Sequence, residues 1–393
     1  MKFTKKSNLL KRIAAMILVA VLVFAFASCN KNPDGKNEEE IVIPQKKVAI
    51  LVAPEEQYPE DYKAAAALAA EYPDTVVVKE YADSRILPGG DPDIMKFSAE
   101  LAADPAIGAI IYARATQYTD LAIRDAKEVN PEIVTVCVEP EDSIDIVASL
   151  ANLVLCVDWS KTAADIVANA KAQGAKHFVV FSFNRHITNN ALLRGVNTAI
   201  KIECEAQGIN YIYDSSLDPI HNFDKPKQYI REAVARLYLN NNIESSDVAL
   251  FSTDSSVQST LIEVANERGL IYVCPSFPTA YNGIGEVYEI EKPEKINDVT
   301  AYIKSAKEAV KADAEGKARL SIYSFPMAST LLKGALHSTF DILNGTTTAE
   351  NLAEKATARV NAAADNKDFT VTAYNTTLKN TFMAYCPGFE VIK

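Results

Sequence analysis

The sequence predicts an α/β protein made of two doubly wound parallel-sheet lobes joined by a hinge. Short apolar runs alternate with longer helical segments from about residue 46 to residue 345. The cycle of strand and helix begins again at a seam near residues 158–162. The chain has 393 residues, more than one hydrophobic core usually organises. Strands linked through helices form right-handed crossovers, so each half of the chain should give its own mostly parallel sheet.

The first half carries continuous apolar runs, which are typical of strands covered by helices on both faces. We expect its strands at 48–53, 76–78, 109–112, 133–138 and 153–157. An alanine-rich helix should follow the first strand, and the dipeptide Asn130-Pro131 should end the last helix. The expected helices of this half are 61–72, 93–103 and 119–129.

The second half repeats the pattern. Its expected strands are 178–181, 211–213, 248–251 and 271–273, and its helices are 160–173, 190–206, one with Pro226 in its first turn, and 257–267. Gly174 and Gly269 mark helix ends. Residues 290–318 look helical and charged, 320–324 and 327–343 form a late strand and helix, and the tail beyond residue 346 looks irregular.

The amino terminus reads as an export signal. Lysines and arginines precede a 15-residue apolar run at Ile13–Ala27, which is shorter than the roughly 20 residues of a membrane-spanning helix. The sequence Phe26-Ala27-Ser28-Cys29 resembles the bacterial lipobox. That resemblance implies cleavage before Cys29, lipid on its thiol, and an extracytoplasmic protein anchored to the bacterial cell membrane. An ordinary secretory signal that happens to end in cysteine is the alternative.

These patterns divide the chain into four parts. Residues 1–28 would be a signal peptide, and 29–45 a flexible tether. An N-terminal lobe would comprise 46–158 plus about 320–393, and a C-terminal lobe 159–319. The net charge of −11, which becomes more negative once the basic signal is removed, argues against nucleic-acid partners.

The remaining cysteines and the histidines show no metal-ligand spacing and no C-x-x-C pair. We therefore expect the cysteines to be small buried hydrophobes, with no disulfide framework, metal or cofactor.

Four segments together resemble the type I periplasmic substrate-binding proteins. They are 108–116, 157–180, 249–254 with the helix after it, and 327–345. The leader and the acidic body look most like the nucleoside-binding lipoproteins of the basic-membrane-protein type. The resemblance implies two lobes that close on a small polar solute, a nucleoside or a sugar, and an ABC permease as partner. Parallel sheets bind ligands beyond the carboxyl ends of their strands, so polar residues at those ends are the candidate ligand contacts.

Three candidates belong to the second half. Asp254 ends a strand, and its counterpart in the resembled family accepts hydrogen bonds from ligand hydroxyls; capping the next helix is the equal alternative. Asn184 and Arg185 follow another strand, where arginine could grip a carboxylate or hydroxyls. Arg194 is the competing basic position.

Six candidates belong to the first half and the seam between the halves. Each follows an expected strand, where it could face ligand or serve a structural role: an interlobe salt bridge for the arginine, a plug in the hinge for the tryptophan, a surface helix start for the first pair. They are Glu55, Tyr58, Arg114, Tyr118, Asp158 and Trp159. Glu139 and Glu141 also follow a strand, but we expect them to be solvated.

The leading function is therefore solute capture for an ABC importer. An extracytoplasmic sensor that signals ligand occupancy to a membrane receptor is the alternative, since the same fold serves both. The sequence contains no G-x-S-x-G, H-E-x-x-H, P-loop or glycine-rich dinucleotide turn, so we expect no enzyme and no catalytic residues. The leader likewise argues against a cytoplasmic repressor of this fold.

Overall fold

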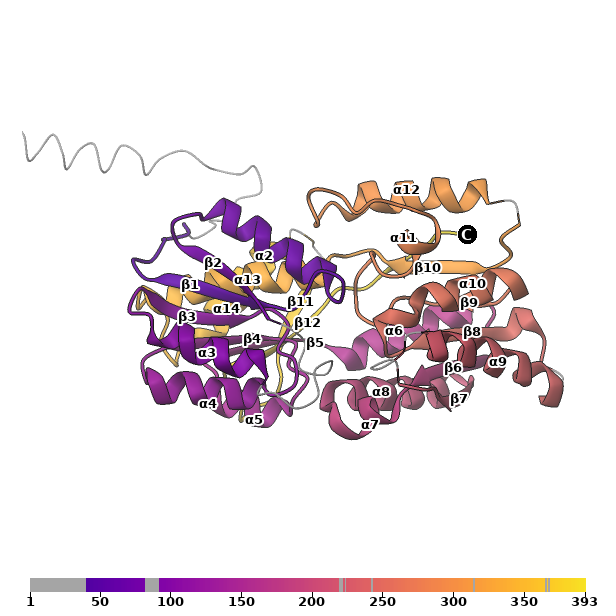
Figure 1. Cartoon of the computed structure of the whole chain (residues 1–393), viewed down its shortest axis with the longest axis horizontal. Helices are drawn as coiled ribbons and strands as arrows, with labels where there is room; N and C mark the ends of the chain where they lie inside the picture. Colours follow the sequence, from indigo (N-terminus) through magenta and orange to yellow (C-terminus); the bar gives the residue numbers. More distant parts are fainter. Residues whose placement is uncertain are drawn as a thin grey trace, which may run out of the picture. The chain divides into compact units, whose positions relative to one another are not determined.

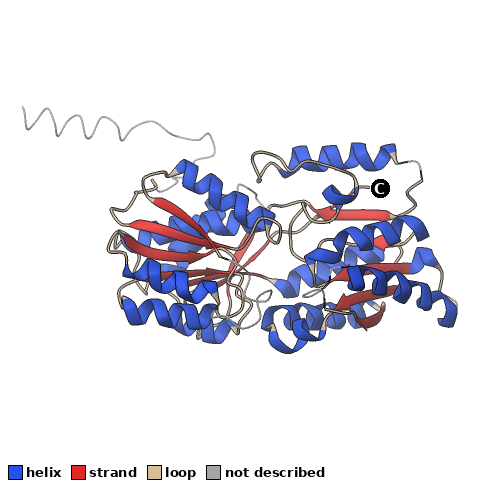
Figure 2. Cartoon of the chain, viewed as in Figure 1, coloured by secondary structure: helices blue, strands red, loops and turns tan. Residues whose placement is uncertain are grey.

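The computed structural model describes residues 40–81, 92–218, 222, 224–241, 243–313, 315–364, 366 and 368–393. The signal peptide, Cys29 and most of the expected tether lie outside the described residues. Residues 42–393 form one compact unit. Its strands form two sheets, and helices pack against them, which confirms the predicted α/β class (Figure 1, Figure 2).

The first sheet has the order β11-β12-β5-β4-β3-β1-β2. All its pairings are parallel except that of the edge strand β11. Its strands are β1 (Lys47–Val52), β2 (Val76–Glu80), β3 (Ile107–Tyr112), β4 (Val134–Val138), β5 (Leu153–Val157), β11 (Thr370–Ala373) and β12 (Thr381–Tyr385). The order reverses between β1 and β3, which is the topological switch point of a doubly wound sheet.

Helices cover both faces of this sheet (Figure 1). On one face α3, α4 and α5 follow one another, and on the other α2 packs against α13, which also contacts α14. Their bounds are α2 Pro59–Glu71, α3 Asp93–Ala103, α4 Thr119–Val129, α5 Ile144–Leu150, α13 Met327–Leu343 and α14 Leu352–Ala364. The bounds of α3, α4 and α13 are those expected, and α2 was expected within two residues of its bounds.

The second sheet has the order β13-β10-β9-β8-β6-β7, so its five parallel strands repeat the winding of the first sheet. Its strands are β6 (His177–Ser182), β7 (Asn210–Ser215), β8 (Val248–Ser252), β9 (Ile271–Tyr272), β10 (Arg319–Tyr323) and the antiparallel β13 (Phe389–Val391). Its helices are α6 Trp159–Ala172, α7 Asn184–Asn189, α8 Ala191–Gln207, α9 Asp224–Asn241, α10 Gln258–Arg268, α11 Ile284–Val287 and α12 Val299–Ala312.

The chain passes between the two sheets three times: from β5 into α6, from β10 into α13, and from β12 into β13. This arrangement corrects two expectations. The strand at 319–323 pairs with β9 in the second sheet, not in the first. The tail beyond residue 346 is not irregular, because it supplies α14 and an edge strand pair to the first sheet and β13 to the second.

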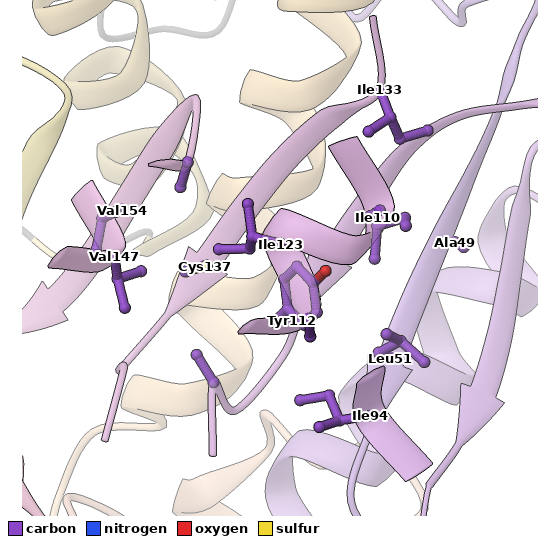
Figure 3. Packing of buried hydrophobic residues seen from close by; sticks show 14 of the residues in the cluster. Ala49, Leu51, Ile94, Ile110, Tyr112, Ile123, Ile133, Cys137, Val147 and Val154 are labelled. Atoms are coloured by element: carbon purple, nitrogen blue, oxygen red, sulfur yellow. The ribbon is translucent and has the colours of Figure 1, made fainter. Parts of the chain in front are cut away.

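Apolar side chains of the strands and of the helices on one face form the core of the first sheet. Figure 3 shows Leu51, Ile110 and Tyr112 of the sheet beside Ile94 of α3 and Ile123 of α4, all of which are buried. Because these strands are buried on both faces, their polar groups emerge only where a strand ends. The core therefore places the candidate site at the carboxyl ends of the strands.

Candidate functional site

A cavity of about 520 Å³ lies where the carboxyl ends of strands from both sheets meet. Its walls come from the segments after β1, β3 and β4 in the first sheet and after β6, β8 and β9 in the second, together with the start of α6. A volume of this size suits a small organic ligand. Its position agrees with the expectation that polar strand ends gather at one site.

Arg114 lies at the centre of the first wall and is buried. Its guanidinium stacks 3.6 Å from the ring centroid of Phe277 and 4.8 Å from that of Tyr58. Its Nη2 donates a hydrogen bond to Asp61 Oδ2 at 3.2 Å. The ion pair lies within the first half of the chain, so it is not an interlobe salt bridge; the contact from the second half is the Phe277 ring.

Glu60 and Asp61 form the floor beside this arginine. Both belong to the first turn of α2, where a helix favours negative charge, and both are only 2% exposed. Glu60 Oε1 accepts hydrogen bonds from the backbone N–H and the hydroxyl of Ser329. Burial raises the pKa of Glu60 to about 7, although these hydrogen bonds favour its charged form.

Trp159 joins the cavity to the first passage between the sheets. Its Nε1 donates to Glu139 Oε1 at 2.7 Å, and its ring lies edge-on to Phe277 with 6.1 Å between centroids. Glu139 is fully buried and also accepts a hydrogen bond from the backbone N–H of Val157. Burial raises the pKa of Glu139 to about 7. Trp159 thus lines the cavity at the start of α6, and its contact with ligand stays a prediction.

The second wall carries Asp254 and His186. Asp254 Oδ1 accepts the backbone N–H of Ser256, and Oδ2 lies 3.6 Å from His186 Nε2. His186 is buried, and its Nδ1 lies 3.0 Å from the Thr253 hydroxyl. Asp254 therefore caps a helical turn and also lines the cavity, and its contact with ligand stays a prediction.

Arg185 lines the same wall, but its guanidinium is already held. Its Nε and Nη2 donate to the two carboxylate oxygens of Asp218 at 2.8 and 3.0 Å. Arg194, the competing position, does not line the cavity and donates to the carbonyls of Ile187 and Thr188.

Five of the nine predicted contacts line the cavity, namely Tyr58, Arg114, Trp159, Arg185 and Asp254. The other four do not line it. Glu55 pairs with Lys63 at 3.7 Å, and Tyr118 is 43% exposed at the start of α4. Asn184 is the first residue of α7, and its side chain is exposed. Asp158 is buried as the N-cap of α6, where its side chain accepts a hydrogen bond from the Lys161 N–H.

Several lining residues were missed, above all Glu60, Asp61, His186 and Phe277. The expectation for Glu139 and Glu141 was wrong, since both are buried. Glu141 accepts a hydrogen bond from the Tyr58 hydroxyl at 3.2 Å and lines the cavity. Both glutamates are buried because β5 and the start of α8 enclose the turn after β4.

The described residues hold no group of three or more His, Cys, Asp or Glu placed to bind a metal. Cys137, Cys156, Cys204 and Cys274 are buried, as expected, but Cys386 is only half-buried. Within the same residues, no helix combines the length and the apolar character needed to cross a membrane.

A family described as proteins of unknown function, DUF3798, matches residues 46–321. This chain belongs to the DUF3798 family. The match runs from β1 into β10 and so contains every segment that lines the cavity. A curated uncharacterized protein of Treponema pallidum (strain Nichols) is 25% identical over 120 residues, which is 30% of this chain. The DUF3798 chain matches 55% of that relative's length.

Solved structures share the fold. A candidate transcriptional regulator from Clostridium difficile 630 is 17% identical, with a TM-score of 0.67 over 89% of this chain and all of the other. An ABC transporter solute-binding protein from Clostridium phytofermentas, with bound L-rhamnose, is 11% identical, with a TM-score of 0.52 over 88% of this chain and 96% of the other. A periplasmic ribose ABC transporter protein from Conexibacter woesei is 14% identical, with a TM-score of 0.50 over 77% and 87%. The DUF3798 chain thus has the type I periplasmic-binding-protein fold.

Proposed function

We propose that this protein is a membrane-anchored, extracytoplasmic solute-binding lipoprotein that captures a small polar solute, nucleoside-like or sugar-like, for an ABC importer. The observation that carries the proposal is the cavity of about 520 Å³ at the carboxyl ends of both sheets. Two proteins that share this fold are described as ABC-transporter components, one of them with a bound sugar. The proposal assigns binding and no catalysis.

Contacts between the two halves support a capture mechanism. The Phe277 ring of the second half covers Arg114 of the first. Gln117 Nε2 donates to the Asn189 carbonyl at 2.8 Å, and the Ala191 N–H donates to the Glu141 carbonyl at 3.0 Å. Only short segments connect the sheets, so a hinge motion can break these contacts, admit the solute and then enclose it. An importer could then distinguish loaded from empty protein by shape.

Solute binding is tested with residues 30–393, which contain the whole compact unit, in a thermal-shift screen against nucleosides, monosaccharides, amino acids and short peptides. A ligand at a hundredfold excess over its Kd stabilises the folded state by about 2.7 kcal/mol, which is a visible shift. A hit should be weakened by Asp254→Ala and should change Trp159 fluorescence. If the folded, ligand-free protein responds to none of these classes, the proposal fails.

Anchoring is tested separately by Cys29→Ser in the full chain. We expect the wild-type protein in the membrane fraction, carrying lipid, and the variant without lipid and released from the membrane. If both proteins fractionate alike and carry no lipid, the anchoring part of the proposal is wrong while solute binding stands.

A further inference from the structure

The charges around the cavity are unbalanced at the first wall. Four carboxyl groups are buried at or behind this wall, those of Glu60, Asp61, Glu139 and Glu141. Three of them, Asp61, Glu139 and Glu141, interact electrostatically with Arg114. Among the described residues that line the cavity, the basic side chains are Arg114, Arg185 and His186. Arg185 is held by Asp218 and His186 faces Asp254, so both serve the second wall. Among the described lining residues, Arg114 is thus the one basic side chain at the wall that holds these carboxyl groups, and it is already paired with Asp61.

An oxygen at this wall also lacks a donor. Asp61 Oδ1 is buried and accepts no hydrogen bond from the described residues. Only the other oxygen of this carboxylate, Oδ2, accepts a hydrogen bond from Arg114. A buried carboxylate oxygen without a donor is costly, and a ligand that brings N–H or O–H groups would remove that cost. A ligand group that donates hydrogen bonds and carries a positive charge would therefore be stabilised at this wall.

We propose that the solute carries a protonated primary amine, and that this ammonium group binds between Glu60 and Asp61. This inference rests on the proposed function and names its solute class: a small organic amine, such as an amino sugar or a short diamine. An ammonium group presents three donors and one positive charge, which matches the two carboxyl groups better than a neutral hydroxyl does. Asp254 and the hydroxyl groups of the second wall remain for the polar groups at the other end of the solute.

Proton competition gives the proposal a second signature. The raised pKa of Glu60 means that lowering the pH protonates this carboxyl group in the empty site. Glu60 is faced by Asp61 on its own helix, by Ser329 of α13, and by Thr279 and Tyr281 after β9. A bound ammonium favours the ionised carboxylate, so amine affinity should fall as pH drops from 8 to 5.

The test uses matched pairs of probes that differ in charge and little else. Glucosamine is compared with glucose, and 1,4-diaminobutane and 1,6-diaminohexane with the corresponding diols, by calorimetry on residues 30–393 at pH 5, 6, 7 and 8. The amino groups of the diamines stay protonated through pH 8, as a lysine side chain does, whereas glucosamine loses its proton near that pH and is therefore compared with glucose at pH 7 and below. We expect a diamine to bind at least about tenfold tighter than its diol at pH 8, the size of one charge-assisted hydrogen bond.

Two variants assign the effect to this wall. Glu60→Gln keeps the acceptor for the Ser329 N–H and removes the charge, so it should cost the amine about tenfold and leave its neutral partner nearly unchanged. Glu128→Gln, on an exposed position of α4, is the matched control and should change neither. Should Glu60→Gln fail to fold, the wild-type pH profile decides, because amine affinity that is constant from pH 5 to 8 overturns the inference.

The failures of the two proposals are distinguishable. Neutral partners that bind as tightly as the amines, or amines that fail while nucleosides or sugars bind, overturn the amine assignment and leave solute capture standing. Silence of the amines and of the whole screening panel overturns both.

Discussion

At the scale of residues, the site is dominated by carboxyl groups that are buried instead of solvated. Glu60 and Glu139 each have a pKa raised to about 7 by burial. In an unfolded chain such groups titrate near 4.5, so between these values the folded state holds more protons than the unfolded state. Their protonated forms favour folding below about pH 4.5, and this contribution is lost as the pH rises through 7.

We therefore predict that the ligand-free protein loses thermal stability as the pH rises from about 5 to about 8. Glu60→Gln should flatten this dependence and be more stable than the wild type at pH 8, because its amide has no buried charge to form. Calorimetric melting temperatures across that range provide the measurement, with Glu128→Gln as the control. A wild-type melting temperature that climbs over the same range would show that these carboxyl groups are hydrated.

The sequence analysis did not predict that these carboxyl groups are buried. Glu139 follows β4, where an acidic residue is ordinarily solvated, and only the pairing of β5 beside it and the indole of Trp159 bury it. Glu60 and Asp61 stand after Pro59 in the first turn of a helix, the usual place for exposed acids. The packing of α13 and of Phe277 against that turn joins residues more than 200 positions apart, which no local pattern reveals.

At the scale of elements, local patterns worked for the strands that contain a continuous apolar run. Strands β1 to β5 of the first sheet contain such runs and were found near their observed bounds, whereas the interior strand β12 was missed although it is mostly buried. Strands β11 and β13 are exposed or half-buried and three or four residues long, so they lack the apolar run that marks a central strand. The helix α14 was missed as well; it packs on α13, where Gly334 lets the two approach closely.

Alanine at Gly334 tests this close approach. A Cβ atom there would lie 2.7 Å from Val360 Cγ2 and 2.8 Å from its Cα, so one helix must move. We expect Gly334→Ala to lower the free energy of unfolding by about 1–3 kcal/mol, the usual cost of overpacking. Gly195 in α8 has nothing within 4 Å, so Gly195→Ala should instead stabilise by about 1 kcal/mol through helix propensity. Chemical denaturation measures both, and equal effects would contradict the packing argument.

At the scale of the whole molecule, the proposed capture mechanism depends on the three passages between the sheets. The second and third touch, since the Ser324 N–H donates to the Gly388 carbonyl. Gly388 has φ +121°, and a Cβ atom there would lie 2.8 Å from the Ser324 hydroxyl. A substitution at this point acts on the hinge without touching the cavity.

We predict that Gly388→Ala changes solute affinity, because the strained hinge alters the balance between open and closed forms. Gly345 supplies the control. It also has a positive φ, +69°, but nothing lies within 4 Å of its added Cβ and it lies away from the three passages. Gly345→Ala should lower stability by about 1 kcal/mol and leave affinity unchanged. Calorimetric titration of both variants with any solute found in the screen measures these affinities. If the two variants bind the solute equally well, the contact at Gly388 has no influence on binding.

The division of the last strands between the two sheets has a consequence for biosynthesis. β12 completes the parallel part of the first sheet, and β13 is an edge strand of the second. Both lie between residues 381 and 391. During translation, neither sheet can acquire all its strands until residues 381–391 have been polymerised. Both sheets therefore stay incomplete until then, which would keep the nascent chain in the unfolded state that the proposed export requires.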